Sequence, residues 1–398
     1  MPPSTVSTKH GGSWITLSGI PVARANNLLS ASYQVYRHTL TNDTVLRTLS
    51  YGLPAALLEH VQTVAPTTHF SFPRTPRQEP LMRRGEAGAP EKAVAGELGT
   101  EFSSHNETSH DENVVTPSLL RSMYRTSEYV PGAGDRNVLG IMTFHNDYAS
   151  PVDLGLFMTE YRTDGTPAAC TDVQIGDGAF DSSNPSPEAS LDVQYAEAMA
   201  YPTRLMCYST GGSHTTNDSL INWVDYMLGQ TNAPQTISLT YGIYEFGVPP
   251  DYAKHVCNQF AILGARGVSV LIASGDNGVG EGNCLFDNDD GDGNLLIQFQ
   301  PTFPSTCTCG IFTLPTSSTQ RLAQTVHHTV HAGPWVTSVG GTTGISPEVA
   351  ANLSGGGFSG YFPRPSYQDN AVSTFLEDLE DQYVGFYKCA RFRDPRCQ

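Results

Sequence analysis

The sequence predicts a doubly wound parallel α/β domain preceded by a small α+β module. From Thr116 onward, segments with helical spacing alternate with short apolar runs, the order expected for a parallel sheet with crossover helices. The run 268–273 is apolar on both faces, as in a sheet covered by helices on each side. The 398 residues, of which 39% are hydrophobic, suffice for two to three domains of roughly 150 residues each.

The first module covers residues 1–69. VARANNLL has apolar residues at helical spacing, YQVYRH and TVLRTLSYG alternate as strands do, and AALLEHV is again helical. Residues 70–115 are rich in Pro, Gly, Ser and charged residues and have no periodic apolar face. They are expected to form an exposed, protease-sensitive linker.

The larger domain is predicted to cover residues 116–398. Helices are expected at 118–125, 153–162, 187–200, 220–228 and 250–266, and strands at 137–143, 204–208, 236–241, 268–273 and 335–339. There is no internal repeat and no low-complexity segment.

The charge balance excludes some classes of function. Asp and Glu outnumber Lys and Arg by 39 to 22, a net charge of -17, so no basic patch is present to bind nucleic acid. Charged residues make up only 15% of the chain, which suits a secreted protein working in acid. No apolar run approaches the roughly 20 residues of a membrane-spanning helix. The first residues show no signal peptide.

The cysteines favour disulfides over zinc. Eight are present and none forms a CxxC pair, so one or two disulfides are expected, with the pairing left open. They are Cys170, Cys207, Cys257, Cys284, Cys307, Cys309, Cys389 and Cys397. Four N-x-Ser/Thr sequons begin at Asn42, Asn106, Asn217 and Asn352.

The segment 186–199, SPEASLDVQYAEAM, is the first candidate for chemistry. Ser186 suits an N-cap and Pro187 the first helical position. Glu188 and Asp192 are four residues apart, so their carboxylates project from one helix face. Two such groups sharing a proton could form a general base that works in acid. The alternative is a solvated acidic face near a helix start.

The second candidate is 267–280, GVSVLIASGDNGVG, a buried strand that runs into a Gly-rich turn. Asp276 follows the carboxyl end of the strand, the edge at which open α/β sheets collect functional groups. The alternative is ordinary turn chemistry, because Asp-Asn-Gly is common in turns. The segment contains neither a dinucleotide-binding fingerprint nor a phosphate-binding loop.

Together these motifs resemble the sedolisin family of serine-carboxyl peptidases, in particular its secreted fungal tripeptidyl-peptidases. The family's catalytic helix reads E-x-x-x-D and its oxyanion loop S-G-D-x-G. The resemblance continues through TYGIYEFGVPPDYA, FPSTC, PWVTSVGGTTG and GGGFSGYFPRPSYQ, and the first module resembles the second half of the activation prodomain.

The resemblance implies a subtilisin-like sheet after a partial ferredoxin-like prodomain. It implies that Glu188 is the general base for a serine nucleophile, that Asp192 orients Glu188 and shares its proton, and that Asp276 is the oxyanion-hole acid. Asp276 must be protonated to donate to an oxyanion, so activity would require acid. The resemblance also implies a secreted, monomeric zymogen with bound calcium, polypeptide substrates and its own prodomain as partners, without membrane or nucleic acid.

The sequence departs from the family pattern at the nucleophile. The family's serine lies in an S-G-T-S-x-S motif after FPRPSYQ, and no such motif occurs here. Ser359 and Ser274 are poor substitutes, so the chain is expected to lack a nucleophile and to be inactive as written. The family's C-terminal calcium site is expected to be absent as well. The acidic loop 287–293 does not replace it, because it lacks the closing Glu of an EF-hand.

Two segments interrupt the resemblance. Residues 308–333 are an expected insertion, explained by a retained intron, and their His327, His328 and His331 are a weak zinc candidate. The final KCARFRDPRCQ diverges as a frameshift would, and the first half of the family's prodomain has no counterpart here. The chain is therefore expected to be truncated at both ends. The leading hypothesis is a tripeptidyl-peptidase-like acid peptidase, and the alternative is a non-catalytic pseudopeptidase that binds peptides. A subtilisin-like peptidase with a histidine base lacks the required Asp-Gly-His segment.

Overall fold

The computed structural model describes residues 5–9, 14–37, 44–70, 114–132, 136–144, 147–176, 178–181, 183–211, 219–280, 285–287, 295–297, 299–307, 335–345 and 347–378. The predicted linker, the acidic loop after residue 287, the insertion 308–333 with its histidines and the final residues therefore lie outside the described residues, apart from single residues at their edges. Within the described ranges, no helix is long and apolar enough to cross a membrane.

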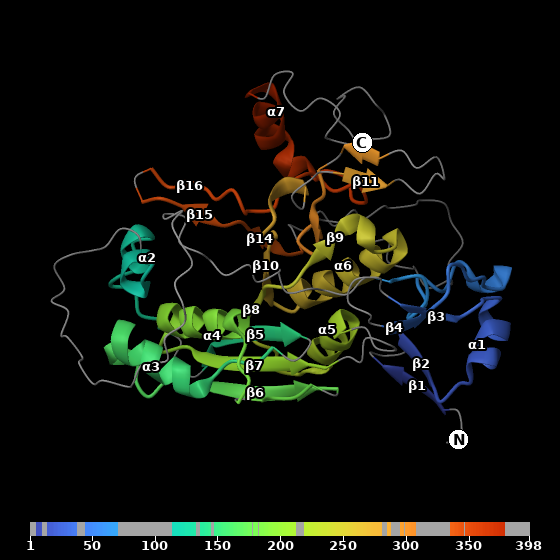
Figure 1. Cartoon of the computed structure of the whole chain (residues 1–398), viewed down its shortest axis with the longest axis horizontal. Coiled ribbons are helices and arrows are strands. Elements are labelled where there is room, and N and C mark those ends of the chain that lie inside the picture. The colour runs from blue at the N-terminus through green and yellow to red at the C-terminus, as the bar shows by residue number, and fades with distance from the viewer. Residues whose placement is uncertain are drawn as a thin grey trace, which may run out of the picture.

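The N-terminal module is α+β, as predicted. Its elements are β1 (Thr5–Lys9), β2 (Trp14–Ser18), α1 (Val22–Leu29), β3 (Gln34–Arg37) and β4 (Thr44–Arg47). The strands pair as two antiparallel hairpins, β1 with β2 and β3 with β4 (Figure 1). The helix expected in AALLEHV is only a 3-10 turn, η2 (Ala55–Leu57). Leu57 and Leu58 are exposed, so no packing stabilises a longer helix there.

The main domain is built on a six-stranded sheet with the order β14-β10-β8-β5-β7-β6. All neighbouring strands are parallel. The strands are β5 (Val138–Phe144), β6 (Cys170–Ile175), β7 (Arg204–Thr210), β8 (Thr236–Leu239), β10 (Ser269–Ala273) and β14 (Thr337–Val339).

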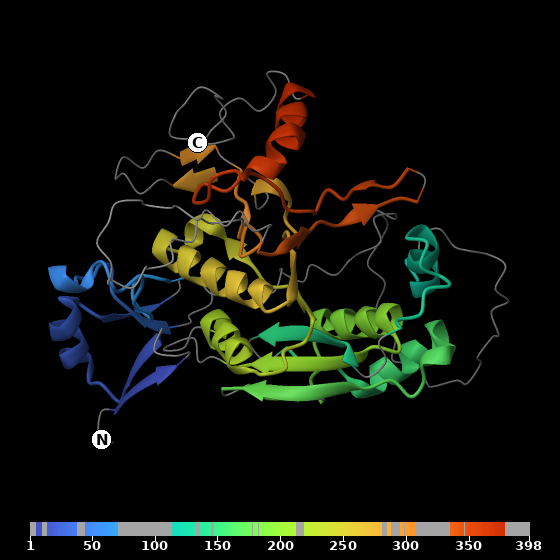
Figure 2. The ribbon, with the colours of Figure 1, turned by 180° about the vertical axis from the view of Figure 1, so that it is seen from behind.

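Helices cover both faces of this sheet (Figure 2). On one face, α3 (Pro151–Tyr161) and α4 (Pro187–Ala200) bury Met158 and Val193 against Ile141 and Leu205. On the other, α5 (Ser219–Gly229) and α6 (Pro250–Ala265) form the larger core. The doubly wound prediction is therefore confirmed, because each face of the sheet supplies apolar side chains to its own core.

Smaller elements surround the sheet. They are α2 (Pro117–Met123), η4 (Thr163–Gly165), β9 (Ile243–Tyr244), η5 (Glu245–Gly247), η6 (Gly278–Gly280), β11 (Leu285–Asp287), β12 (Leu295–Ile297), β13 (Thr302–Phe303), β15 (Thr342–Thr343), β16 (Val349–Ala350), η7 (Ser366–Gln368) and α7 (Asp369–Asp378). The pairs β9 with β13, β11 with β12 and β15 with β16 are antiparallel.

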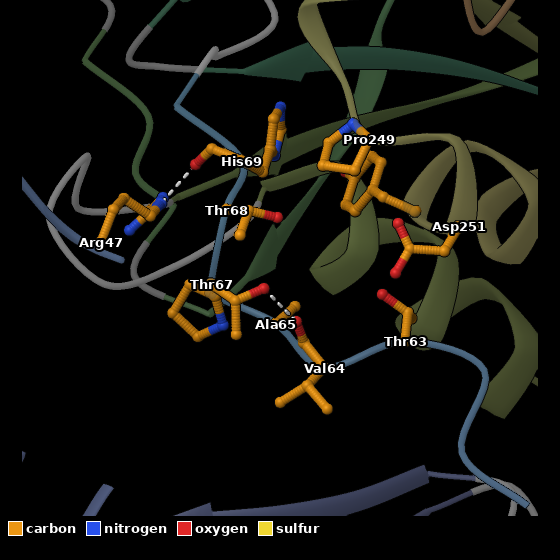
Figure 3. Close-up of a pocket in the computed structure, with 11 residues that line it drawn as sticks. Arg47, Thr63, Val64, Ala65, Thr67, Thr68, His69, Pro249 and Asp251 are labelled. Carbon is orange, nitrogen blue, oxygen red and sulfur yellow. Dashed lines mark hydrogen bonds between the residues drawn. The ribbon is translucent and has the colours of Figure 1, made fainter. Parts of the chain in front are cut away.

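The N-terminal module docks on the first half of α6. The Trp14 and His255 rings stack with centroids 4.9 Å apart, and the His69 and Tyr252 rings lie 4.6 Å apart. The Tyr51 hydroxyl donates to Asp251 Oδ2 at 3.2 Å. A small pocket at this junction is lined by residues 63–69 and by the start of α6 (Figure 3).

Two disulfides are present among the described cysteines, in agreement with the expected number. Cys170–Cys207 joins the adjacent strands β6 and β7, and Cys257–Cys307 joins α6 to the turn after β13. Both Cα separations, 5.8 and 5.1 Å, are ordinary for a disulfide. Persistent disulfides are typical of proteins in oxidising compartments.

Candidate active site

The start of α4 is defined by local capping. The Ser186 hydroxyl accepts a hydrogen bond of 3.1 Å from the Ala189 N–H, and Pro187 occupies the first turn. The helix covers the residues that the sequence predicted, and Glu188 lies in its first turn. Glu188 and Asp192 are therefore one turn apart on the same side of α4.

Asp192 is held by the strand beside it. Thr240, directly after β8, donates from Oγ1 to Asp192 Oδ2 at 2.9 Å. Burial raises the pKa of Asp192 well above its ordinary value, and the nearby Glu188 raises it further. Thr240 favours the ionised form but does not outweigh burial. Burial and the charge of Glu188 thus favour the protonated form of Asp192.

Glu188 has a raised pKa for related reasons. Burial is the largest cause, followed by the negative charges of Asp276 and Asp147, while Thr240 acts in the opposite direction. Asp276 follows β10 at the carboxyl end of the sheet, immediately after Gly275, whose φ of 108° favours glycine. Partial desolvation of the carboxyl raises the pKa of Asp276 too, although the residue is exposed by surface area.

The fold thus brings three predicted residues into one electrostatic cluster. The negative charge of Asp276 raises the pKa of both Glu188 and Asp192, although Asp276 is more than eighty positions away in the chain. The roles assigned to these residues stay predictions.

Sequence reasoning missed Thr240, Tyr241 and Asp147. Tyr241 is buried, and its hydroxyl donates to Asp147 Oδ2 at 2.7 Å. Asp147 follows β5, so its position after a sheet strand was the available signal. Burial raises the pKa of Asp147, and its hydrogen bonds from Tyr241 and Ser186 lower it.

A glycine-rich segment holds the loop that carries Asp276. The Gly278 N–H donates to the Leu353 carbonyl at 2.8 Å, and the Gly355 N–H donates to the Gly275 carbonyl at 2.9 Å. A Cβ at Gly355 would lie 1.9 Å from the Ser274 carbonyl oxygen, so only glycine fits there. The segment after β16 therefore fixes the backbone on both sides of Asp276.

Neither remaining serine candidate has a free hydroxyl. The Ser359 hydroxyl donates to Glu245 Oε1 at 2.5 Å and accepts from the backbone N–H groups of Tyr361 and Phe362. The Ser274 hydroxyl lies 3.4 Å from that of Ser354.

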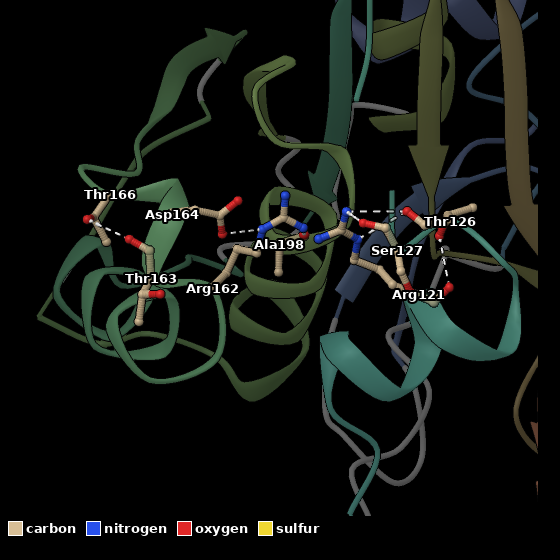
Figure 4. A network of polar contacts seen from close by, with 8 residues as sticks. All are labelled: Arg121, Thr126, Ser127, Arg162, Thr163, Asp164, Thr166 and Ala198. Atoms are coloured by element: carbon tan, nitrogen blue, oxygen red, sulfur yellow. Dashed lines mark hydrogen bonds and ion pairs between the residues drawn. The ribbon is translucent and has the colours of Figure 1, made fainter. Parts of the chain in front are cut away.

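The far end of α4 is anchored by a buried arginine (Figure 4). Arg162 Nη1 donates to the Ala198 carbonyl at 3.0 Å, and its Nε pairs with Asp164 Oδ1 at 2.7 Å. In the same view, Arg121 donates to the carbonyls of Thr126 and Ser127 after α2. The helix that carries Glu188 and Asp192 is thus fixed at both ends.

The calcium site of the family stays an expectation for this chain. Across the described ranges, no group of three or more His, Cys, Asp or Glu side chains is placed to hold a metal ion.

Comparisons with known proteins found one family model, several curated relatives and several solved structures that are similar to this chain. The family described as "Pro-kumamolisin, activation domain" matches residues 4–70. Tripeptidyl-peptidase SED2 of Arthroderma otae is 30% identical over 94% of the chain, and the probable tripeptidyl-peptidase SED3 of Trichophyton verrucosum is 32% identical over 94%. The chain spans 59% and 58% of the lengths of these two relatives. The solved structure of Pseudomonas sedolisin, a serine-carboxyl proteinase, matches with a TM-score of 0.39 and 16% identity, covering 64% of this chain and 66% of that one.

The chain thus combines a doubly wound sheet with a module similar to an activation domain, and it is 30–32% identical along most of its length to proteins named as peptidases. The chain is therefore similar to members of the sedolisin family, and the two relatives described above are named as tripeptidyl-peptidases.

Proposed function

We propose that this chain carries the base and oxyanion parts of a serine-type acid peptidase that releases tripeptides from the free N-termini of polypeptides. One observation supports the proposal most. Burial raises the pKa of both Glu188 and Asp192, and the negative charge of Asp276 raises both further. The names of the related peptidases support the tripeptidyl action.

Each of these carboxyls has its own role in the proposed reaction. Ionised Glu188 takes the proton of a serine hydroxyl as the serine oxygen bonds to the substrate carbonyl carbon. Protonated Asp276 donates a hydrogen bond to the oxyanion that forms. The intermediate then collapses, the C–N bond breaks, and the leaving amine takes the proton from Glu188. A water molecule next attacks the acyl–serine ester while Glu188 takes its proton. The C–O bond to the serine oxygen breaks, that oxygen takes the proton back from Glu188, and the tripeptide is released as its carboxylic acid. Asp192 orients Glu188 and shares its proton. Acid is required because Asp276 donates only when protonated.

In this proposal the chain does not supply the nucleophile. Ser359 and Ser274 are engaged in structural contacts, and no S-G-T-S motif occurs in the sequence. We therefore propose that the chain as written binds peptides without hydrolysing them. This is also the observation that favours the second candidate function, a non-catalytic pseudopeptidase.

The first experiment is sequencing of the full-length transcript across and beyond the region encoding residues 300–398. A transcript that omits the region near residues 308–333 and continues into an S-G-T-S motif supports an active acid peptidase. A transcript that ends as written supports the pseudopeptidase.

The second experiment assays the chain itself with a fluorogenic tripeptide amide that has a free N-terminus, from pH 3 to 7. We expect no turnover, but binding of the tripeptide in acid that Glu188→Gln weakens. An N-acetylated tripeptide is the matched ligand control. Turnover by the chain as written would refute the hypothesis that it lacks a nucleophile. Equal binding of both tripeptides would refute the proposed tripeptidyl-peptidase specificity.

We also propose that the protein is a secreted, monomeric glycoprotein. The two disulfides support an oxidising compartment. Asn352 is the one sequon asparagine within the described ranges, and it is exposed in a turn. Glycopeptide mass spectrometry of the protein secreted by a yeast host tests this, with Asn352→Gln as control. Unmodified Asn352 in the secreted protein would contradict glycosylation at that position.

A further inference from the structure

Asp147 lies where three elements of the candidate site meet. It follows β5, it accepts a hydrogen bond from Tyr241 after β8, and it accepts another from Ser186 at the start of α4. The Ser186 backbone N–H also donates to the Tyr148 carbonyl at 2.8 Å. The segment 147–148 is therefore bonded twice to the residue that caps α4.

These bonds connect the supports of the two candidate catalytic acids. Ser186 caps the helix that carries Glu188, two residues further on. Tyr241 directly follows Thr240, which binds Asp192 at 2.9 Å. Asp147 thus joins the backbone that positions Glu188 to the strand end that positions Asp192.

We propose that Asp147 is a positioning residue of this site, which ties the cap of α4 to the end of β8 and places its carboxyl beside the Glu188–Asp192 pair. The inference deepens the proposed acid-peptidase function and rests on it.

The charges around Asp147 support the electrostatic half of the proposal. Glu188 and Asp192 on α4 both feel its negative charge, and Asp276 adds a further negative charge to both. Tyr241 and Tyr148 also face it, and Asp181 acts on Tyr148. No cationic side chain is among the described groups that shift the pKa values of these four carboxyls. Removing one negative charge from such a set makes ionisation of the others easier.

Asp147 itself can stay ionised better than an isolated buried carboxyl. The Tyr241 and Ser186 hydroxyls both donate to it, and the N-terminus of the 14-residue helix α4 lies beside it. Both hydrogen bonds favour its ionised form against the burial that raises its pKa.

Two substitutions separate the role of the negative charge of Asp147 from that of its hydrogen bonds to Tyr241 and Ser186, which are called the tether below. Asp147→Asn removes the charge but keeps an oxygen that can accept from Tyr241 and Ser186. Asp147→Ala removes both. Asp153→Asn is the matched control, because Asp153 is an exposed acid in the first turn of α3.

The test is a titration of the full chain by carboxyl ¹³C NMR, with Glu188→Gln and Asp192→Asn used to assign the signals. We expect Asp147→Asn to lower the apparent pKa of the pair by roughly half a unit or more, with amide hydrogen exchange at Ala189 unchanged. Asp147→Ala should lower the pKa similarly and also speed that exchange. Asp153→Asn should change neither.

The proposal is overturned if Asp147→Asn leaves the titration of the pair unchanged, or if Asp153→Asn shifts it equally. Faster exchange in Asp147→Asn, equal to that in Asp147→Ala, would overturn the separate role of the charge. Should Asp147→Ala not fold, Tyr241→Phe tests the tether instead, since it removes one bond and must speed exchange at Ala189. The proposed function fails in a different way, namely if Glu188 and Asp192 of the unmodified chain titrate at ordinary carboxyl values.

Discussion

The Thr240 hydroxyl donates a hydrogen bond of 2.9 Å to Asp192 Oδ2, although the two residues lie 48 positions apart in the sequence. This bond is formed between the end of β8 and the second turn of α4. It stabilises the ionised form of Asp192 against the strong effect of burial.

Replacing Thr240 with Val should therefore raise the pKa of Asp192 further. The shape is nearly conserved, while the donor is lost, so we expect a loss of about 1–2 kcal/mol in the free energy of unfolding above the pKa of Asp192. Urea denaturation across pH measures this, with Thr236→Val on the same strand as control. A stability equal to that of the unmodified chain throughout would show that the bond contributes nothing.

Glu197 should make the fold less stable at neutral pH. It is 5% exposed, and burial raises its pKa from 4.5 to about 7. Below pH 4.5 both the folded and the unfolded states hold the proton. As the pH rises from 4.5 to 7, only the unfolded state releases it, so stability falls, by up to about 3 kcal/mol.

Glu197→Gln should remove that dependence. We expect higher stability than the unmodified chain at pH 8 and a similar stability at pH 4, measured by urea denaturation. Glu160→Gln, an exposed position on α3, is the control and should behave like the unmodified chain. The same gain at pH 4 as at pH 8 would mean that the effect is packing and not proton binding.

Ser359 should behave as a structural residue. Ser359→Ala removes the donor to Glu245, a fully buried carboxyl, and we expect a loss of about 1–3 kcal/mol in the free energy of unfolding. Thermal unfolding measures this, and Ser366→Ala at an exposed position is the control. An unchanged melting temperature would argue against this role.

The two disulfides should each stabilise the fold. Cys170–Cys207 closes a separation of 37 residues and Cys257–Cys307 one of 50. The chain-entropy argument predicts roughly 3–4 kcal/mol for each. Replacing both cysteines of one pair with Ser, followed by chemical denaturation, measures this, and peptide mapping without reduction checks the pairing. Other linkages in the map would refute the assignment.

Trp14→Ala should weaken the docking of the N-terminal module, because Trp14 stacks on His255 of α6. After proteolytic cleavage between residues 71 and 113, residues 1–70 should remain bound in the unmodified chain and dissociate more readily in the variant. Gel filtration of the cleaved protein measures this. Ile15→Ala, at an exposed position on the same strand, is the control. Equal retention in both variants would show that the stacking is unimportant.

Local patterns in the sequence determined much of this protein. The bounds of α4 follow from Ser186, Pro187 and helical spacing, all of which act within one segment. The same spacing set Glu188 and Asp192 on one face, and the apolar run of β10 placed Asp276 at a strand end. The edge strand β6, CTDVQI, was missed because its exposed polar residues separate its apolar ones, so its sequence has no apolar run.

Only the tertiary structure decided which distant residues meet. It placed Tyr241 against Asp147 across 94 positions, joined Cys257 to Cys307, and occupied the Ser359 hydroxyl with Glu245. Each contact depends on how strands are ordered in the sheet and how helices pack on it, and no local periodicity encodes that order. The raised pKa values of the carboxyl cluster have the same origin, because burial and neighbouring charges arise only when separate segments come together.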